Sequence, residues 1–216
     1  MPITVVNLTY VWYIQGDNLS QLLAYSSLLP IAIVIIVLTL VVSRRDLQTG
    51  LLATGAFICE ALNITLKRVI KQPRPLESLR TGHGMPSDHA QFMFFFATYM
   101  TCIMLTMRFS NATKVLGSMS LFTTSTVVAF SRIHMKVHTL EQVIIGGLIG
   151  ALFAIIWHVI VRKFVRPSMY FWIQTSAIGR ALYIRDCSHI DDVVKLEYEA
   201  VMNCHGSALY CRNKLE

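Results

Sequence analysis

Long apolar stretches alternate with short polar segments along most of this chain. A helix that crosses a bilayer needs about 20 predominantly apolar residues. Stretches of approximately this kind predict five membrane-spanning helices, at about Leu22–Val42, Leu51–Leu66, Ala90–Met107, Val115–Phe130 and Leu140–Val161. The pattern therefore predicts an all-α fold, a polytopic membrane helix bundle.

The stretch that follows is less apolar. Met169–Ile184 is interrupted by Gln174 and Arg180, and it carries a tyrosine and a tryptophan. Aromatic residues of this kind are common where a helix lies at the membrane–water interface. We therefore expect one membrane-embedded domain over residues 1–168, and an interfacial helix with an extramembrane C-terminal tail over residues 169–216.

Composition supports a membrane protein and excludes other classes. Hydrophobic residues make up 54% of the chain, charged residues only 14%, and the mean hydropathy is +0.54, which is too apolar for an ordinary soluble domain. The net charge of +7 does not indicate nucleic-acid binding, because the basic residues lie between apolar stretches rather than in one patch. Phosphate groups or anionic lipid are the expected partners. The five cysteines show no metal-ligand spacing, so we expect neither a metal site nor a disulfide framework.

Charge also predicts the orientation of the chain. With five crossings, the loops Lys67–His89 and Ser131–His138 lie on one face of the membrane. The opposite face then holds the remaining basic residues of the short loops, in Arg44–Arg45, Arg108–Lys114 and Arg162–Arg166. By the positive-inside rule that opposite face, and with it the C-terminal tail, is cytosolic. The two polar loops then face a lumen or the cell exterior, and Asn7 on their side is the sequon best placed for glycosylation.

Three polar clusters lie at the ends of the apolar stretches, where charge is rare unless it has a function. The first runs from Lys67 to Pro75. Lys67 ends a predicted helix, and the prolines on either side of Arg74 hold it on a rigid turn. An arginine held in this way can bind phosphate oxygens in two places. Lys67 and Arg74 are therefore candidate phosphate ligands, although basic residues at a membrane edge also extend to lipid headgroups.

The second cluster, Met85–His89, precedes the third predicted crossing. Asp88 and Gln91 have the spacing of a capping box, so we expect a helix to start near His89 with the Asp88 carboxylate as its cap. A helix N-terminus offers free amide groups to an anion. Because the Ser87 hydroxyl and the His89 imidazole lie beside these amides, the cluster predicts a phosphate site with a proton donor. The alternative is a plain helix cap.

The third cluster, Ser131–Gln142, links the fourth and fifth predicted crossings. Thr139 and Gln142 have the spacing of a second capping box, which would hold His138 just before a helix start. A neutral imidazole in this position can attack phosphorus and form a phosphohistidine. With Arg132 the three clusters supply a nucleophile, an acid and a cationic clamp, which together can transfer a phosphoryl group without a metal ion.

At these positions the chain resembles the type 2 phosphatidic acid phosphatase superfamily. That pattern reads Lys, six residues, Arg-Pro; then Pro-Ser-Gly-His; then Ser-Arg, five residues, His, three residues, Asp. The resemblance implies a metal-independent phosphatase without a cofactor, in which His138 is the nucleophile and His89 is the general acid. It also implies a set of phosphate-binding residues, which are Lys67, Arg74, Ser87 and Arg132.

Two positions depart from this pattern. Asp88 replaces the glycine and adds a negative charge near the expected anion. Gln142 replaces the aspartate that orients the nucleophilic histidine, and we expect it to take that catalytic role because its oxygen can still accept a hydrogen bond from the ring. Gln142, together with Gly84–Phe92 (GMPSDHAQF) and Ile184–Ser188 (IRDCS), is similar to the dolichyldiphosphatase branch of the superfamily.

Resemblance to that branch implies hydrolysis of dolichyl diphosphate to dolichyl phosphate and inorganic phosphate at the luminal face of the endoplasmic reticulum membrane. The reaction would recycle the lipid carrier of protein N-glycosylation. Two alternatives stay open. A related lipid phosphatase would act on phosphatidate, a sphingoid phosphate or another polyprenyl diphosphate, which present the same terminal phosphate. A catalytically silent protein would only bind lipid phosphate or scaffold partners, as Asp88 and Gln142 suggest.

Overall fold

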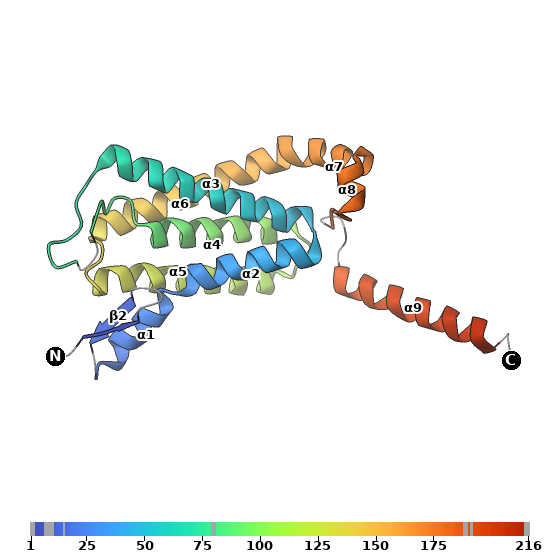
Figure 1. The fold of residues 1–216 in the computed structure, drawn as a ribbon, viewed down its shortest axis with the longest axis horizontal. Helices are drawn as coiled ribbons and strands as arrows, with labels where there is room; N and C mark the ends of the chain where they lie inside the picture. Colours follow the sequence, from blue (N-terminus) through green and yellow to red (C-terminus); the bar gives the residue numbers. More distant parts are fainter. Residues whose placement is uncertain are drawn as a thin grey trace.

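The computed structural model of the protein describes residues 3–6, 11–14, 16–78, 81–187, 190 and 192–213. Their main feature is a bundle of long helices (Figure 1): α2 (Leu29–Arg44), α3 (Leu47–Ile70), α4 (Asp88–Thr106), α5 (Asn111–His134) and α6 (Leu140–Ile160). The predicted helical bundle is confirmed. Helix α4 lies at its centre and contacts α2, α3, α5 and α6.

Three stretches of the described residues are long and apolar enough to cross a membrane, namely Asn18–Arg44, Leu47–Ile70 and Leu140–Ile173. Helices α4 and α5 have 19 and 24 residues, so they are comparably long but less apolar. Because α4 is surrounded by other helices, it presents less surface to lipid and tolerates more polar residues. Crossing by α4 and α5 stays a prediction.

The N-terminal region contains structure that the apolar pattern did not predict. Strands β1 (Ile3–Val6) and β2 (Val11–Ile14) pair in an antiparallel hairpin. Both strands are rich in β-branched or aromatic residues, a signal that favours strands. The first predicted crossing, Leu22–Val42, is divided between a short helix, α1 (Asn18–Ser26), and α2, which begins after a turn with Pro30 at its start. Asn7 lies outside the described residues.

The C-terminal helices also differ from the prediction. Helix α6 ends at Ile160, as predicted, but the chain stays helical through a π-helical segment, Val161–Val165, into α7 (Arg166–Thr175). Pro167 lacks an N–H group, and the preceding π-helical segment changes the backbone pairing at this point. The helix break comes only at Ser176, which caps α8 (Ala177–Ala181). The prediction of one helix over residues 169–184 was therefore wrong in its bounds.

The chain ends in a further helix, α9 (Val193–Asn213), which extends away from the bundle (Figure 1). From the sequence we expected only an extramembrane tail here. Glu197, in the second turn of α9, accepts a hydrogen bond from Arg185 at 2.7 Å and lies 3.5 Å from Arg44. The start of α9 is therefore tied to the end of the bundle at which α2 finishes.

The contact between α4 and α6 depends on two glycines. Gly146 and Gly150 form a small-xxx-small pair on α6, which predicts close approach of a second helix, and the structure confirms it. A Cβ atom at Gly146 would lie 2.7 Å from the carbonyl oxygen of Ser87, and one at Gly150 would overlap the carbonyl oxygen of Gln91. Helix α6 can therefore lie directly on the first turn of α4.

Replacing Gly146 with alanine is expected to destabilise the fold, because the added Cβ meets backbone atoms that cannot rotate away. Overpacking of this kind costs about 1–3 kcal/mol, which should lower the midpoint of thermal unfolding in detergent by several degrees. Gly50→Ala is the matched control, since a Cβ at Gly50 meets no atom within 4 Å. Equal loss of stability in the two variants would contradict this account of the contact.

Candidate active site

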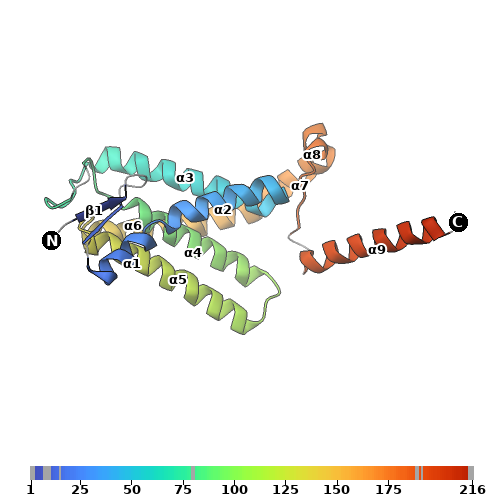
Figure 2. The same ribbon diagram turned by 60° about the horizontal axis from the view of Figure 1, so that its bottom comes forward.

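Four helix ends meet at one end of the bundle and carry the polar clusters (Figures 1 and 2). Lys67 lies in the last turn of α3, and Ser87 is the N-cap of α4. Arg132 lies in the last turn of α5, and Gln142 lies in the first turn of α6. Because consecutive helices run in opposite directions, the loops that follow α3 and α5 lie at the same end.

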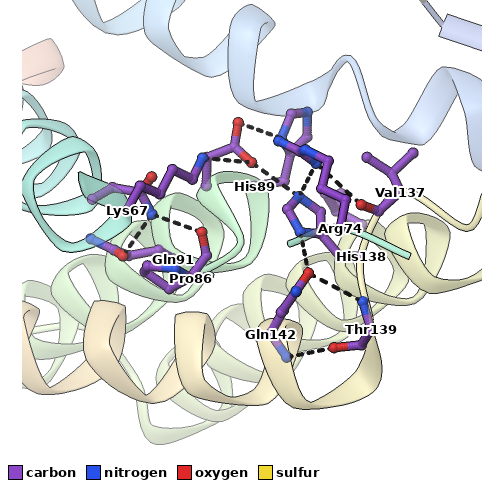
Figure 3. A network of polar contacts seen from close by, with 12 residues as sticks. Lys67, Arg74, Pro86, His89, Gln91, Val137, His138, Thr139 and Gln142 are labelled. Carbon is purple, nitrogen blue, oxygen red and sulfur yellow. Dashed lines mark hydrogen bonds and ion pairs between the residues drawn. The ribbon is translucent and has the colours of Figure 1, made fainter. Parts of the chain in front are cut away.

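His138 lies at the centre of this arrangement, and its side chain is 0% exposed. Its Nδ1 is 3.1 Å from Oε1 of Gln142, and its Nε2 is 3.1 Å from Nη1 of Arg74 (Figure 3). An amide oxygen only accepts hydrogen bonds, so Nδ1 carries the ring proton. Nε2 therefore presents its lone pair toward the basic side chains.

The Gln142 side chain joins His138 to the loop that carries Arg74. Besides accepting from His138, Oε1 accepts from the backbone N of Thr139 at 3.4 Å. The amide nitrogen donates to Oε1 of Gln72 at 3.0 Å and to the carbonyl oxygen of Pro73 at 2.9 Å. An aspartate could not donate these two bonds. The predicted capping box between Thr139 and Gln142 is present.

Arg74 and Lys67 bring positive charge to the site from different elements. Besides its contact with His138, Nη1 of Arg74 donates to the carbonyl oxygen of Val137 at 3.1 Å. Nζ of Lys67 lies 3.8 Å from Oδ1 of Asp88. The two basic groups therefore flank the space in front of the buried imidazole (Figure 3).

The structure corrects the predicted start of α4. Ser87, not Asp88, is the N-cap, and Gln91 forms no capping box. The Gln91 side chain is buried and instead accepts from Asn63 at 2.9 Å and donates to the carbonyl oxygen of Cys59 at 2.9 Å. These bonds link α3 to α4 directly beneath the site. Asn63 was missed as a supporting residue because its role depends on the packing of two helices.

The Asp88 carboxylate faces the cluster rather than the helix end. Its Oδ2 lies 3.4 Å from Nδ1 of His89, and its Oδ1 lies 3.5 Å from Nε2 of His138. Burial alone would raise the pKa of the Asp88 carboxyl, but the charge of His89, the close contacts with His138 and His89, and the charge of Lys67 hold that pKa well below its usual range. The carboxylate therefore lies toward Lys67, His89 and His138 and does not cap the helix.

Backbone hydrogen bonds connect Ser87 and Arg132 to the site. The N–H of Ser87 donates to the carbonyl oxygen of Gln142 at 3.0 Å. The carbonyl oxygen of Arg132, whose side chain is buried, accepts from the backbone N of Val137 at 3.1 Å and of His138 at 3.2 Å. The structure thus brings all seven candidate residues to one place: Lys67, Arg74, Ser87, His89, Arg132, His138 and Gln142.

The electrostatics of the site favour a neutral His138. Burial lowers the pKa of its imidazole below the ordinary 6.5; the nearby Asp88 carboxylate raises it, and Arg74 lowers it further. The neutral form, which is the nucleophilic one, is therefore present at neutral pH.

The lowered pKa of the His138 imidazole predicts how activity depends on pH. If neutral His138 is the nucleophile, kcat/KM should stay on its plateau as the pH falls through 6.5 and decrease only at lower pH, since kcat/KM reports groups of the free enzyme. A pH–rate profile in detergent tests this. An acid limb with its midpoint above 6.5 would contradict the assignment.

Comparison with known proteins shows the family to which the chain belongs. A model of the PAP2 superfamily matches residues 48–166, which include the three polar clusters. The chain belongs to the PAP2 superfamily. It is 40% identical over 207 residues to Dolichyldiphosphatase 1 of Dictyostelium discoideum, covering 93% of this chain and 90% of that relative. Over 205 residues it is 36% identical to Dolichyldiphosphatase 1 of Mus musculus, covering 89% of this chain and 86% of that relative.

The fold is similar to a crystal structure of a transmembrane PAP2-type phosphatidylglycerolphosphate phosphatase from Bacillus subtilis. The TM-score is 0.60 at 17% identity, and the match covers 70% of this chain and 80% of that one. The predicted family resemblance is thus confirmed by sequence, and the PAP2-type membrane bundle by structure.

Proposed function

We propose that this PAP2 superfamily member hydrolyses dolichyl diphosphate to dolichyl phosphate and inorganic phosphate through a phosphohistidine. The observation that carries the proposal is the buried imidazole of His138, whose Nδ1 is held by Gln142 and whose Nε2 faces basic side chains. The two relatives named Dolichyldiphosphatase 1 support the choice of substrate.

In the proposed reaction, Nε2 of His138 attacks the terminal phosphorus, and the bond from that phosphorus to the bridging oxygen breaks. His89 gives a proton to the departing dolichyl phosphate. His89 then takes a proton from water, the oxygen attacks the phosphohistidine, and the P–N bond breaks to release inorganic phosphate and His138. Charge on the transferring phosphoryl oxygens is stabilised by four residues. These are Lys67, Arg74, Ser87 and Arg132.

An apolar groove supports a lipid substrate. It has a volume of about 360 Å³, lies between α2, α3 and α4, and reaches Asp88 and His89 at one end. Apart from these two residues and Glu60 its walls are apolar, with Ile31, Ile35, Ala53, Ala56, Phe92 and Phe96 among them. A hydrocarbon chain that enters the groove would have its phosphate at the histidine cluster.

We also propose that the site faces the lumen of the endoplasmic reticulum. The basic residues that the positive-inside rule assigns to the cytosol follow α2, α4 and α6, at the end of the bundle opposite the site. Two native sequons test the orientation. Asn7→Gln should remove a glycosylation-dependent shift in mobility, and Asn111→Gln should not. Modification of Asn111 would mean that the orientation is inverted.

The proposed activity is tested with purified protein in the presence of a chelator, on dolichyl diphosphate, dolichyl phosphate and phosphatidate. Inorganic phosphate should be released mainly from dolichyl diphosphate, at a rate that the chelator does not change. Faster release from phosphatidate would indicate a different lipid phosphatase. Release from none of the three would favour a silent lipid-phosphate-binding protein.

A further inference from the structure

The Asp88 carboxylate contacts three groups that the proposed mechanism directs at phosphate. Its Oδ1 lies 3.8 Å from Nζ of Lys67 and 3.5 Å from Nε2 of His138, and its Oδ2 lies 3.4 Å from Nδ1 of His89. These contacts come from α3, from α4 and from the loop before α6. A single anionic side chain therefore occupies the position in which these three groups would hold a phosphoryl group.

The position of the carboxylate conflicts with that of a substrate. A phosphorus atom attacked by Nε2 of His138 has to lie about 3–3.5 Å from that nitrogen. Oδ1 of Asp88 already lies at 3.5 Å. Two anions cannot share this space, because of their volume and because like charges at such short range repel each other strongly. The carboxylate has to move before phosphate can bind.

The site has a further polar group that the carboxylate does not satisfy. The Ser87 hydroxyl is buried, and no described residue forms a hydrogen bond with it. A buried hydroxyl without a partner is costly. A phosphoryl group offers more oxygens than a carboxylate does, and Ser87 lies next to Asp88 in the chain. The site is therefore built for a larger anion than the one that occupies it.

We propose that Asp88 is a specificity-determining residue whose carboxylate competes with free inorganic phosphate for the basic site and is displaced by the lipid-bound substrate. A lipid diphosphate gains apolar contacts in the groove between α2, α3 and α4, and these contacts help it to displace the carboxylate. Free phosphate has no such contacts. The same competition favours release of the inorganic phosphate product. This inference rests on the proposed function for the phosphate-binding role of the site and for the identity of the lipid.

The test is direct binding of inorganic phosphate to the full-length protein in detergent, measured by calorimetry without turnover. Asp88→Asn is expected to bind phosphate about 10-fold more tightly than the wild type, since juxtaposed like charges weaken binding substantially. The control is Glu141→Gln. Glu141 is exposed in the first turn of α6, and its carboxylate accepts a hydrogen bond from Gln72 at 3.4 Å, away from the ion pairs of the cluster. The affinity of the Glu141→Gln variant for inorganic phosphate should differ from that of the wild type by less than about twofold.

A second variant separates the charge effect from a change in fold. Asp88→Gly introduces the residue of the superfamily pattern and should also tighten phosphate binding. In kinetic assays, both variants should lower the inhibition constant for inorganic phosphate more than they lower KM for the lipid substrate. The proposal is overturned if variants that unfold at the wild-type temperature bind phosphate no more tightly than the wild type. Tighter phosphate binding by a protein that cannot hydrolyse dolichyl diphosphate would refute the proposed function and leave this inference standing.

Discussion

Replacing His138 with alanine is expected to reduce kcat by at least about 10⁴-fold, because the residue that would form the covalent intermediate is removed. Its side chain is fully buried and bonded at both ring nitrogens, and no other histidine of the described residues contacts both Gln142 and Arg74. Phosphate release from dolichyl diphosphate measures the effect. Binding of the lipid should change much less than kcat.

The matched control is His134→Ala. His134 lies four residues earlier in the same cluster but is exposed at the end of α5. The His134→Ala variant should retain most of the wild-type activity. His138→Gln, which keeps a polar side chain opposite Arg74, guards against a loss that is due to unfolding alone. If a folded His138 variant retained a tenth of the wild-type rate, the nucleophile would have to be another group.

Gln142→Glu is expected to lower both stability and activity, although it brings the side chain closer to the aspartate of the superfamily pattern. The amide nitrogen of Gln142 donates to Gln72 and to the Pro73 carbonyl, and Gln142 is 0% exposed. A carboxylate would face these two acceptors as a buried charge. Breaking such bonds costs about 2–4 kcal/mol. The loop that carries Arg74 would shift, and the loss in kcat should be about 100-fold.

The pH dependence of kcat/KM is a second measurement on the Gln142→Glu variant. A carboxylate next to Nδ1 of His138 would raise the pKa of the imidazole and move the acid limb of kcat/KM to higher pH. Gln72→Ala is the control, because it removes one acceptor and leaves the Pro73 carbonyl bonded to Gln142. It should cost only a few-fold in rate, in line with one hydrogen bond of about 1 kcal/mol. A Gln142→Glu variant more active than the wild type would show that the glutamine is merely a weaker aspartate.

Much of the fold could be predicted from the sequence because its signals are local. Apolar stretches predicted the long helices, and the spacing of Thr139 and Gln142 predicted a cap that the structure contains. The glycine pair Gly146 and Gly150 predicted the close contact of α6 with α4. The helical continuation past Val161 was missed, because a π-helical segment lets the helix pass a proline that normally marks a boundary.

The details of the site were harder to predict because they depend on residues that meet only after folding. The capping box assigned to Asp88 follows local spacing, but folding brings Lys67 on another helix and His138 on a distant loop next to the carboxylate, which does not cap the helix. The donor role of Gln142 likewise depends on the Pro73 carbonyl, which the chain brings back from a loop about 70 residues earlier.

The most direct test of the proposed mechanism is whether phosphate becomes covalently bound to His138 during turnover. Dolichyl diphosphate labelled in its terminal phosphate would be mixed with the enzyme and quenched in alkali, because phosphohistidine is labile in acid. Mass spectrometry of the peptides then locates the label. We expect label on His138 in the wild type and none in His138→Ala. Turnover that proceeds with label on another residue, or with no labelled residue on the time scale of a single turnover, would contradict it.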